Sequence, residues 1–307
     1  FQQYLVEEFA EDYQEGHLSR REALKLIAGV TGSLLLANTI LAGCAPPPPS
    51  VTSAATGVPV ENQNDEAPSQ AAPVEAGQAG GAEGQEIQFP GGDATLTGYL
   101  AKPAGEGSFP VVLVCHENRG LTEHIKDVTR RLGQAGYLAL AVDLLSRQGG
   151  TSSLASNDVP GLLGNTSPDQ FVSDFLSGWE YLKTLPYAQA DRLGMVGFCF
   201  GGGVTWLMAT RMPELRAAVP FYGPHPPVED VPNIQAAVLG IYAGNDQRIN
   251  QGIPPIEEAM LQNGKIYEKI IYPGTDHAFH NDTGSRYNPE AAKNAWERTL
   301  DWFERYV

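Results

Sequence analysis

Gly197-Phe198-Cys199-Phe200-Gly201 stands between an apolar run and a glycine-rich segment of helical character, Gly202–Met212. The run before it, Asp191–Val196, is typical of a short buried strand. Glycines at both ends of the pentad permit a tight, strained turn. A strand-to-helix turn of this kind lifts its middle side chain above the sheet and leaves backbone N–H groups free to bind an oxyanion. The pentad therefore predicts a nucleophilic thiol at Cys199, with a buried cysteine in a glycine-rich turn as the alternative.

Two polar residues follow later strands in the order that a catalytic triad requires. The apolar run Ala236–Ala243 ends in Gly244-Asn245-Asp246, and a second run ends in Asp276-His277. His277 would take the proton of Cys199 and return it to the leaving group, while Asp246 would hold the imidazole tautomer. Asp276 is a rival acid, but a residue next to the base is badly placed to reach its ring. The order nucleophile, acid, base is that of α/β-hydrolases.

Residues 86–307 resemble the dienelactone hydrolase family. The resemblance is carried by five pieces of sequence: Gly197-Phe198-Cys199-Phe200-Gly201-Gly202, Gly244-Asn245-Asp246, Gly274-Thr275-Asp276-His277-Ala278-Phe279, Cys115-His116-Glu117-Asn118-Arg119-Gly120 and Val142-Asp143-Leu144-Leu145. It implies an α/β-hydrolase fold and hydrolysis of an ester or lactone through a Cys-Asp-His triad. It also implies that Glu117 contacts the resting thiol and helps to generate thiolate, and that the N–H groups of Asn118 and Phe200 form the oxyanion hole. A solvated loop carboxylate is the alternative for Glu117.

The sequence departs from the family's namesake enzyme in its arginines. That enzyme binds the carboxylate of dienelactone with one arginine on a mid-chain helix and one shortly after the catalytic histidine. Here Lys183 is the only basic residue between Arg147 and Arg192, and no arginine follows the predicted base before Arg286. A bidentate clamp on a carboxylate needs a guanidinium group. Dienelactone itself is therefore doubtful as substrate, and Arg119 is predicted either to bind substrate or to be an exposed loop charge.

Alternating apolar strands and amphipathic helices predict an α/β domain with a mostly parallel sheet and helices on both faces. We expect strands at 86–89, 94–101, 111–115, 138–142, 193–196, 217–221, 238–242 and 268–272, and helices at 123–134, 169–184, 202–212, 255–263 and 289–306. Asp143 and the three triad residues then follow carboxyl ends of strands, where ligands bind in open α/β sheets. Residues 147–167 are predicted to be a surface loop, or alternatively a lid.

The composition and residue spacing argue against several classes of partner and cofactor. A net charge of −16 with no basic stripe argues against nucleic acid as a partner. No Cys-x-x-Cys or His-x-x-x-His spacing and no separate glycine-rich dinucleotide fingerprint are present, so we expect no metal and no cofactor. Cys115 and Cys199 both follow strands near the predicted site. A disulfide between them, which would inactivate the enzyme, is the alternative. We expect both thiols to be free, with Cys115 as a small core residue.

The N-terminal residues contain motifs that indicate export and attachment to a membrane. Ser19-Arg20-Arg21 and the residues after it resemble a twin-arginine export signal, and Leu41-Ala42-Gly43-Cys44 resembles a bacterial lipobox whose cysteine is lipidated. The apolar stretch 26–41 spans only about 24 Å as a helix, which favours a processed signal over a permanent membrane span. Residues 1–18 look like an acidic amphipathic helix that could dock a membrane-protein partner. Residues 45–85 are rich in Pro, Ala and Gly and are predicted to be a disordered linker.

These features predict three parts: residues 1–44 as acidic helix and signal or anchor, 45–85 as linker, and 86–307 as catalytic domain. The predicted function is hydrolysis of a small ester or lactone by Cys199, at the outer face of the cytoplasmic membrane. An uncleaved N-terminal helix is the alternative anchor. The alternative function is a binding or scaffold subunit of a membrane assembly, built on a hydrolase fold.

Overall fold

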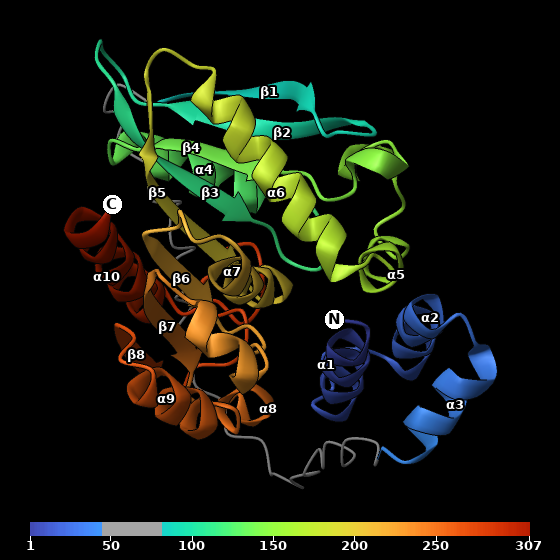
Figure 1. Ribbon diagram of the computed structural model, residues 1–307. Coiled ribbons are helices and arrows are strands. Elements are labelled where there is room, and N and C mark those ends of the chain that lie inside the picture. Colours follow the sequence, from blue (N-terminus) through green and yellow to red (C-terminus); the bar gives the residue numbers. More distant parts are fainter. Residues whose placement is uncertain (45–81) are drawn as a thin grey trace, which may run out of the picture.

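The computed structural model describes residues 1–44 and 82–307, and its centre is one eight-stranded sheet (Figure 1). The strand order is β1-β2-β4-β3-β5-β6-β7-β8. β1 and β2 are antiparallel to each other, and β2 is antiparallel to β4, whereas all other neighbours are parallel. The strands span Glu83–Pro90 (β1), Thr95–Lys102 (β2), Phe109–Cys115 (β3), Leu138–Val142 (β4), Ala188–Phe198 (β5), Ala217–Phe221 (β6), Ala237–Ala243 (β7) and Tyr267–Tyr272 (β8). The central strands β4, β6 and β7 are buried along their whole length, as strands covered on both faces must be.

Helices cover both faces of this sheet. α6 (Pro168–Lys183) and α7 (Phe200–Arg211) lie together on one face, where the rings of Phe171 and Phe200 are 5.4 Å apart (Figure 1). α4 (Glu123–Gln134) and α10 (Pro289–Tyr306) are also neighbours, because the guanidinium of Arg131 lies 5.0 Å from the ring centre of Trp296. α9 (Ile253–Gln262) and the short α8 (Gln247–Asn250) complete the C-terminal half. The predicted α/β architecture is therefore confirmed.

The predicted elements of the catalytic domain agree with the structure to within a few residues, with three differences. β1 begins at Glu83, so residues 83–85 belong to the sheet and not to the predicted linker. β5 begins at Ala188, because its first residues pair with the start of β3 before a register shift. The predicted surface loop 147–167 contains the helix α5 (Val159–Gly164). The rest of the predicted linker, 45–81, lies outside the described residues.

The N-terminal residues form three helices, α1 (Gln2–Gln14), α2 (Arg20–Thr31) and α3 (Leu34–Ala42). Ser19 begins α2 with a capping box to Glu22. The apolar stretch is interrupted where Gly32 takes a φ of 68° and Ser33 caps the next helix. Within the described ranges, no helix combines the length and the hydrophobicity that crossing a membrane would require.

α1 lies next to the catalytic domain (Figure 1), and apolar side chains of this helix are buried there. Leu5 and Phe9 are almost fully buried, and the ring centre of Phe1, just before the helix, lies 5.1 Å from that of Phe200 at the start of α7. α5 packs against α2 at two glycines, Gly161 of α5 and Gly29 of α2. The approach is so close that a Cβ added to Gly161 would lie 2.8 Å from the carbonyl oxygen of Gly29. The segment predicted as loop or lid therefore holds the N-terminal helices against the domain.

Candidate active site

The turn between β5 and α7 has the strained geometry that the pentad predicts. Cys199 adopts φ 58° and ψ −120°, a conformation that L-residues rarely take. Glycine is required at both flanking positions because backbone atoms lie too close to leave room for a Cβ. A Cβ on Gly197 would meet the Gly201 carbonyl at 2.2 Å, and one on Gly201 would meet the carbonyl oxygens of Cys115 and His116 at 2.6 and 2.5 Å. The turn thus brings Cys199 directly beside the end of β3.

Asp246 and His277 form a short, buried hydrogen bond. His277 Nδ1 lies 2.6 Å from Asp246 Oδ2, and the other carboxylate oxygen accepts the N–H of Ile249 at 3.2 Å. Burial works to raise the pKa of Asp246, but the charge of His277 and the hydrogen bond from it lower that pKa overall. Burial works to lower the pKa of His277, yet Asp246 and Cys199 raise it well above its usual value. The rival Asp276 accepts instead from Asn245 Nδ2 at 2.8 Å.

The second imidazole nitrogen of His277 points toward the thiol. A ring nitrogen of His277 lies within 4.8 Å of Cys199 Sγ, and since Nδ1 is bonded to Asp246, the buried Nε2 is the nitrogen left to face the thiol. Cys199 itself is only 2 % exposed. The structure therefore brings the three predicted triad residues into one cluster, in the order thiol, imidazole, carboxylate.

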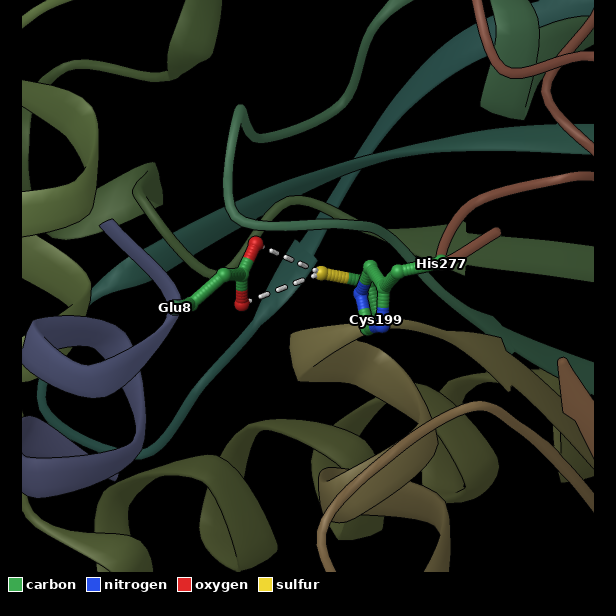
Figure 2. A group of neighbouring side chains, drawn as sticks. All are labelled: Glu8, Cys199 and His277. Atoms are coloured by element: carbon green, nitrogen blue, oxygen red, sulfur yellow. Dashed lines mark hydrogen bonds between the residues drawn. The ribbon is translucent and has the colours of Figure 1, made fainter. Parts of the chain in front are cut away.

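The carboxylate that contacts the thiol belongs to Glu8 of α1, as Figure 2 shows. Cys199 Sγ lies 3.4 and 3.6 Å from the two Glu8 oxygens and 3.4 Å from the hydroxyl of Tyr4. Burial, and then the negative charge of Glu8, raise the pKa of the Cys199 thiol. Both contacts come from residues about 190 positions away in the chain, and sequence analysis did not find them.

Glu117 lies in the same cluster but makes a different contact from the one the family resemblance implies. It is 6 % exposed, so it is not a solvated loop carboxylate, and its Oε2 accepts the side-chain N–H of Asn281 at 2.7 Å. Burial raises its pKa. The resting partner of the thiol is thus Glu8, with Glu117 held by Asn281 beside it.

The two residues predicted for the oxyanion hole flank Cys199. Phe200 is the first residue of α7, so its N–H has no acceptor within the helix. Asn118 is buried in the loop after β3, and its side-chain N–H donates to Glu8 Oε1 at 2.8 Å. Glu8 is therefore held between the thiol and the side chain of Asn118.

A cavity of about 270 Å³ opens at Cys199 and provides room for a small substrate. α1 contributes Glu8 and Asp12 to its wall, and Arg119 and Arg286 line it as well. Arg119 is half-buried and its guanidinium donates to the carbonyl of Ser156 at 3.4 Å, so both of its predicted roles stay open.

Two arginines hold the acidic side of α1 over this cavity. Arg248 Nε donates to Glu11 Oε2 at 2.8 Å, and Arg286 Nη1 donates to Asp12 Oδ1 at 2.8 Å. Arg248 also stacks on Tyr4, with 4.7 Å from its guanidinium carbon to the ring centre. These partly buried pairs fix the position of Glu8 on the thiol. Arg248 lies on α8 just after Asp246, a position that neither of the family's two arginines occupies.

The remaining polar residues near the strand ends have structural partners. Asp143 accepts the N–H of Leu145 and both the N–H and hydroxyl of Thr151, and so anchors the loop after β4. His116 Nε2 accepts the N–H of Leu144 at 3.2 Å and joins that loop to the one after β3. All three cysteines are free, and Cys115 is buried, as expected for a core residue.

Replacing Glu8 by Gln is expected to make the Cys199 thiol more reactive. The change removes the charge that helps to raise the pKa of the thiol, so this pKa falls and the thiolate fraction near neutral pH grows about tenfold per pKa unit. The lower basicity of the thiolate offsets part of this gain. The pH dependence of iodoacetamide labelling at Cys199, followed by peptide mass, should shift to lower pH. The exposed Glu7, one residue away, provides the control Glu7→Gln, and equal profiles for the two variants would contradict the expectation.

Comparison with known proteins agrees with this geometry. Residues 96–307 match the family described as "Dienelactone hydrolase family". A relative from Methylorubrum extorquens, named "Putative carboxymethylenebutenolidase", is 38 % identical over 268 residues, which cover 83 % of this chain and 91 % of that protein. A relative of the same name from Salmonella typhi is 36 % identical over 69 % of this chain and 83 % of its own.

A solved structure supports the same assignment. The crystal structure titled "Putative Dienelactone Hydrolase" from Klebsiella pneumoniae superimposes with a TM-score of 0.68 at 32 % identity, covering 73 % of this chain and 99 % of that one. The fold, the positions of the matching motifs and these relatives agree with one another. The chain therefore belongs to the dienelactone hydrolase family and is a carboxylic-ester hydrolase.

Proposed function

We propose that the chain hydrolyses a small ester or lactone through an acyl-thioester on Cys199. His277 Nε2 takes the thiol proton and the sulfur attacks the carbonyl carbon. The N–H groups of Phe200 and Asn118 bind the oxyanion that forms. The C–O bond then breaks, and His277 returns the proton to the departing alcohol. Water deprotonated by His277 next attacks the thioester, which releases the acid and restores the thiol.

Asp246 and Glu117 have supporting roles in this proposal. Asp246 accepts from Nδ1 of His277, which leaves Nε2 as the nitrogen that faces the thiol, and its charge stabilises the imidazolium. Glu117 is the carboxylate of the loop after β3 that the family resemblance assigns to thiol activation, and it can approach Cys199 only if its partner Asn281 releases it. Arg119 lines the cavity and is the proposed contact for a polar group of the substrate.

The observation that carries the proposal is the 2.6 Å bond between His277 and Asp246 beside the strained Cys199 turn. The test is a rapid-mixing titration of the reduced chain with p-nitrophenyl acetate. We expect a burst of about one p-nitrophenol per chain, followed by slower turnover, because acylation and deacylation are separate steps. Cys199→Ala should show neither phase. A burst that persists in this variant would remove Cys199 as the nucleophile.

A second candidate is the scaffold function, and one observation favours it. α1 covers the cavity and leaves Cys199 only 2 % exposed, with the thiol already in contact with Glu8 and Tyr4. A chain that used the fold only for binding would show no burst although it is folded and reduced, and it would co-purify with a membrane partner. The family assignment and the assembled triad favour the enzyme.

We further propose that the protein is exported and carries a lipid on Cys44 at the outer face of the cytoplasmic membrane. The proposal is supported by the paired Arg20-Arg21 and by Leu41-Ala42-Gly43-Cys44. It is also supported by an apolar surface on α3, where Leu34 and Leu35 are 68 % and 79 % exposed. Cleavage before Cys44 would remove α1 together with Glu8. An uncleaved N-terminal segment that lies on the membrane through α3 is the alternative anchor.

The location is tested by fractionation of cells that produce the chain, followed by mass analysis of its N-terminal peptide. We expect the protein in the membrane fraction, with an acylated Cys44 as its first residue. Cys44→Ala should lose both the lipid and the membrane. If this variant stays at the membrane with residues 1–43 attached, anchoring by the uncleaved segment is correct and lipidation is wrong.

A further inference from the structure

Glu8, Cys199 and His277 bring three different metal-binding atoms to one buried point (Figure 2). A carboxylate oxygen, Sγ and an imidazole nitrogen all lie within 4.8 Å of one another, and all three residues are buried. They come from α1, from the turn before α7 and from the loop after β8. Their positions 8, 199 and 277 form no spacing pattern, which is why the sequence predicted no metal site. We infer that these three side chains form a binding site for Zn²⁺, which holds the enzyme closed and inactive.

The distances suit a tetrahedral zinc ion. Zinc–sulfur bonds of about 2.3 Å and zinc–nitrogen or zinc–oxygen bonds of about 2.0–2.1 Å place tetrahedral ligand atoms roughly 3.3–3.6 Å apart. The pair Cys199 Sγ and Glu8 Oε2 is already at 3.6 Å. His277 Nε2 is buried and accepts no hydrogen bond from any residue that the structure describes, so it offers a free lone pair in the neutral imidazole. The adjoining cavity leaves room for water as the fourth ligand.

The ligands are held in position by a second layer of hydrogen bonds. His277 Nδ1 lies 2.6 Å from Asp246, which reproduces the carboxylate–histidine–metal arrangement common in zinc sites. Glu8 Oε1 is held by the side-chain N–H of Asn118 at 2.8 Å, which leaves Oε2 as the oxygen free to turn toward the metal. Arg286, which lines the cavity, is paired with Asp12 of α1, and Arg248 is paired with Glu11 of the same helix.

The charges balance when zinc binds. The thiol of Cys199 loses its proton to solvent, as does His277 if it is protonated, and no electron is transferred. Zn²⁺ is then matched by one thiolate and one carboxylate, with a neutral imidazole. Thiolate and imidazole favour Zn²⁺ over Mg²⁺ or Ca²⁺, which prefer oxygen ligands.

Zinc at this point would stop catalysis and fix α1 to the domain. The ion uses the sulfur lone pair and the Nε2 lone pair that the proposed hydrolysis needs, and this consequence rests on the proposed function. Because Glu8 belongs to α1, the ion also ties that helix to the catalytic residues. The site therefore exists only before the proposed cleavage at Cys44, in the chain that still keeps α1.

The experiment measures binding without any ester, so it does not depend on hydrolysis. The reduced full chain is titrated with Zn²⁺ in competition with a chromophoric chelator, and with Co²⁺ to detect a thiolate-to-metal absorption band. We expect one ion per chain, and the band should be absent in Cys199→Ser. Glu8→Gln should weaken Zn²⁺ binding by at least about tenfold, since loss of even a group behind a metal ligand costs 10–100-fold. Glu7→Gln should bind as the unaltered chain does, and circular dichroism checks that each variant is folded.

The outcomes separate this site from the proposed function. Equal Zn²⁺ affinity in Glu8→Gln and Glu7→Gln would overturn the inference, because α1 would then contribute no ligand. Stoichiometric binding that survives in Cys199→Ser, or no binding by the unaltered chain, would overturn it as well. Binding with the expected variant pattern but without inhibition of ester turnover would support the metal site, would overturn its inhibitory role, and would show that Cys199 is not the nucleophile.

Discussion

Asp246→Asn is expected to lower kcat about 10⁴-fold while the domain remains folded. The carboxylate raises the pKa of His277 against the effect of burial, and it stabilises the imidazolium that forms when the thiol gives up its proton. An amide at this position offers no charge. It can also donate to Nδ1, which would place the imidazole proton on Nε2, the nitrogen that must accept from Cys199. Steady-state kinetics with p-nitrophenyl acetate measure the loss.

Asp276→Asn is the matched control for this variant. Asp276 is next to the base in sequence but accepts from Asn245, and no hydrogen bond joins it to His277 in the described structure. Its replacement should change kcat only slightly. The pH profile provides a second check: the pKa of His277 should fall in Asp246→Asn, because the group that raises it is gone. A loss of activity in Asp276→Asn as large as in Asp246→Asn would contradict this assignment.

The clustering of Cys199, Asp246 and His277 could be predicted because each of them follows a strand in the sequence. The apolar runs before Cys199, Asp246 and His277 are short and distinct, and parallel strands bring their carboxyl ends to one edge of the sheet. The pentad adds a turn that only small flanking residues allow. Local sequence therefore specified both the sheet and the place where its functional residues meet.

The contribution of α1 could not be predicted in the same way. The amphipathic pattern of residues 1–18 indicates a helix with an apolar side, and Leu5 and Phe9 do bury that side. The pattern does not say what the helix packs against, because the contact with Cys199 spans 191 residues of sequence. A glutamate among four other acidic residues is expected to lie in solvent. Glu8 is instead only 4 % exposed. Long-range packing and the paired arginines, not local propensity, place it on the thiol.

Gly201→Ala is expected to destabilise the domain by about 2–4 kcal/mol, somewhat more than ordinary overpacking of a core. The added Cβ would lie 2.5 Å from the carbonyl oxygen of His116 and 2.6 Å from that of Cys115. Both atoms are backbone at the end of β3, so no side chain can rotate away, and α7 must move from the sheet. For a domain of this size, the midpoint of thermal unfolding should fall by roughly 4–16 °C.

The same movement should reduce activity in the fraction that stays folded, because Gly201 sets the distance between α7 and the loop after β3. The proposed oxyanion N–H of Phe200 belongs to α7, and that of Asn118 belongs to the loop. Gly29→Ala is the control, since Gly29 also lies in a helix but its added Cβ would have nothing nearer than Gly161 Cα at 4.0 Å. It should leave activity intact and stabilise the chain by up to about 1 kcal/mol, the helix preference of alanine over glycine. Equal effects of the two substitutions on thermal unfolding would mean that close contact at the end of β3 does not constrain the turn.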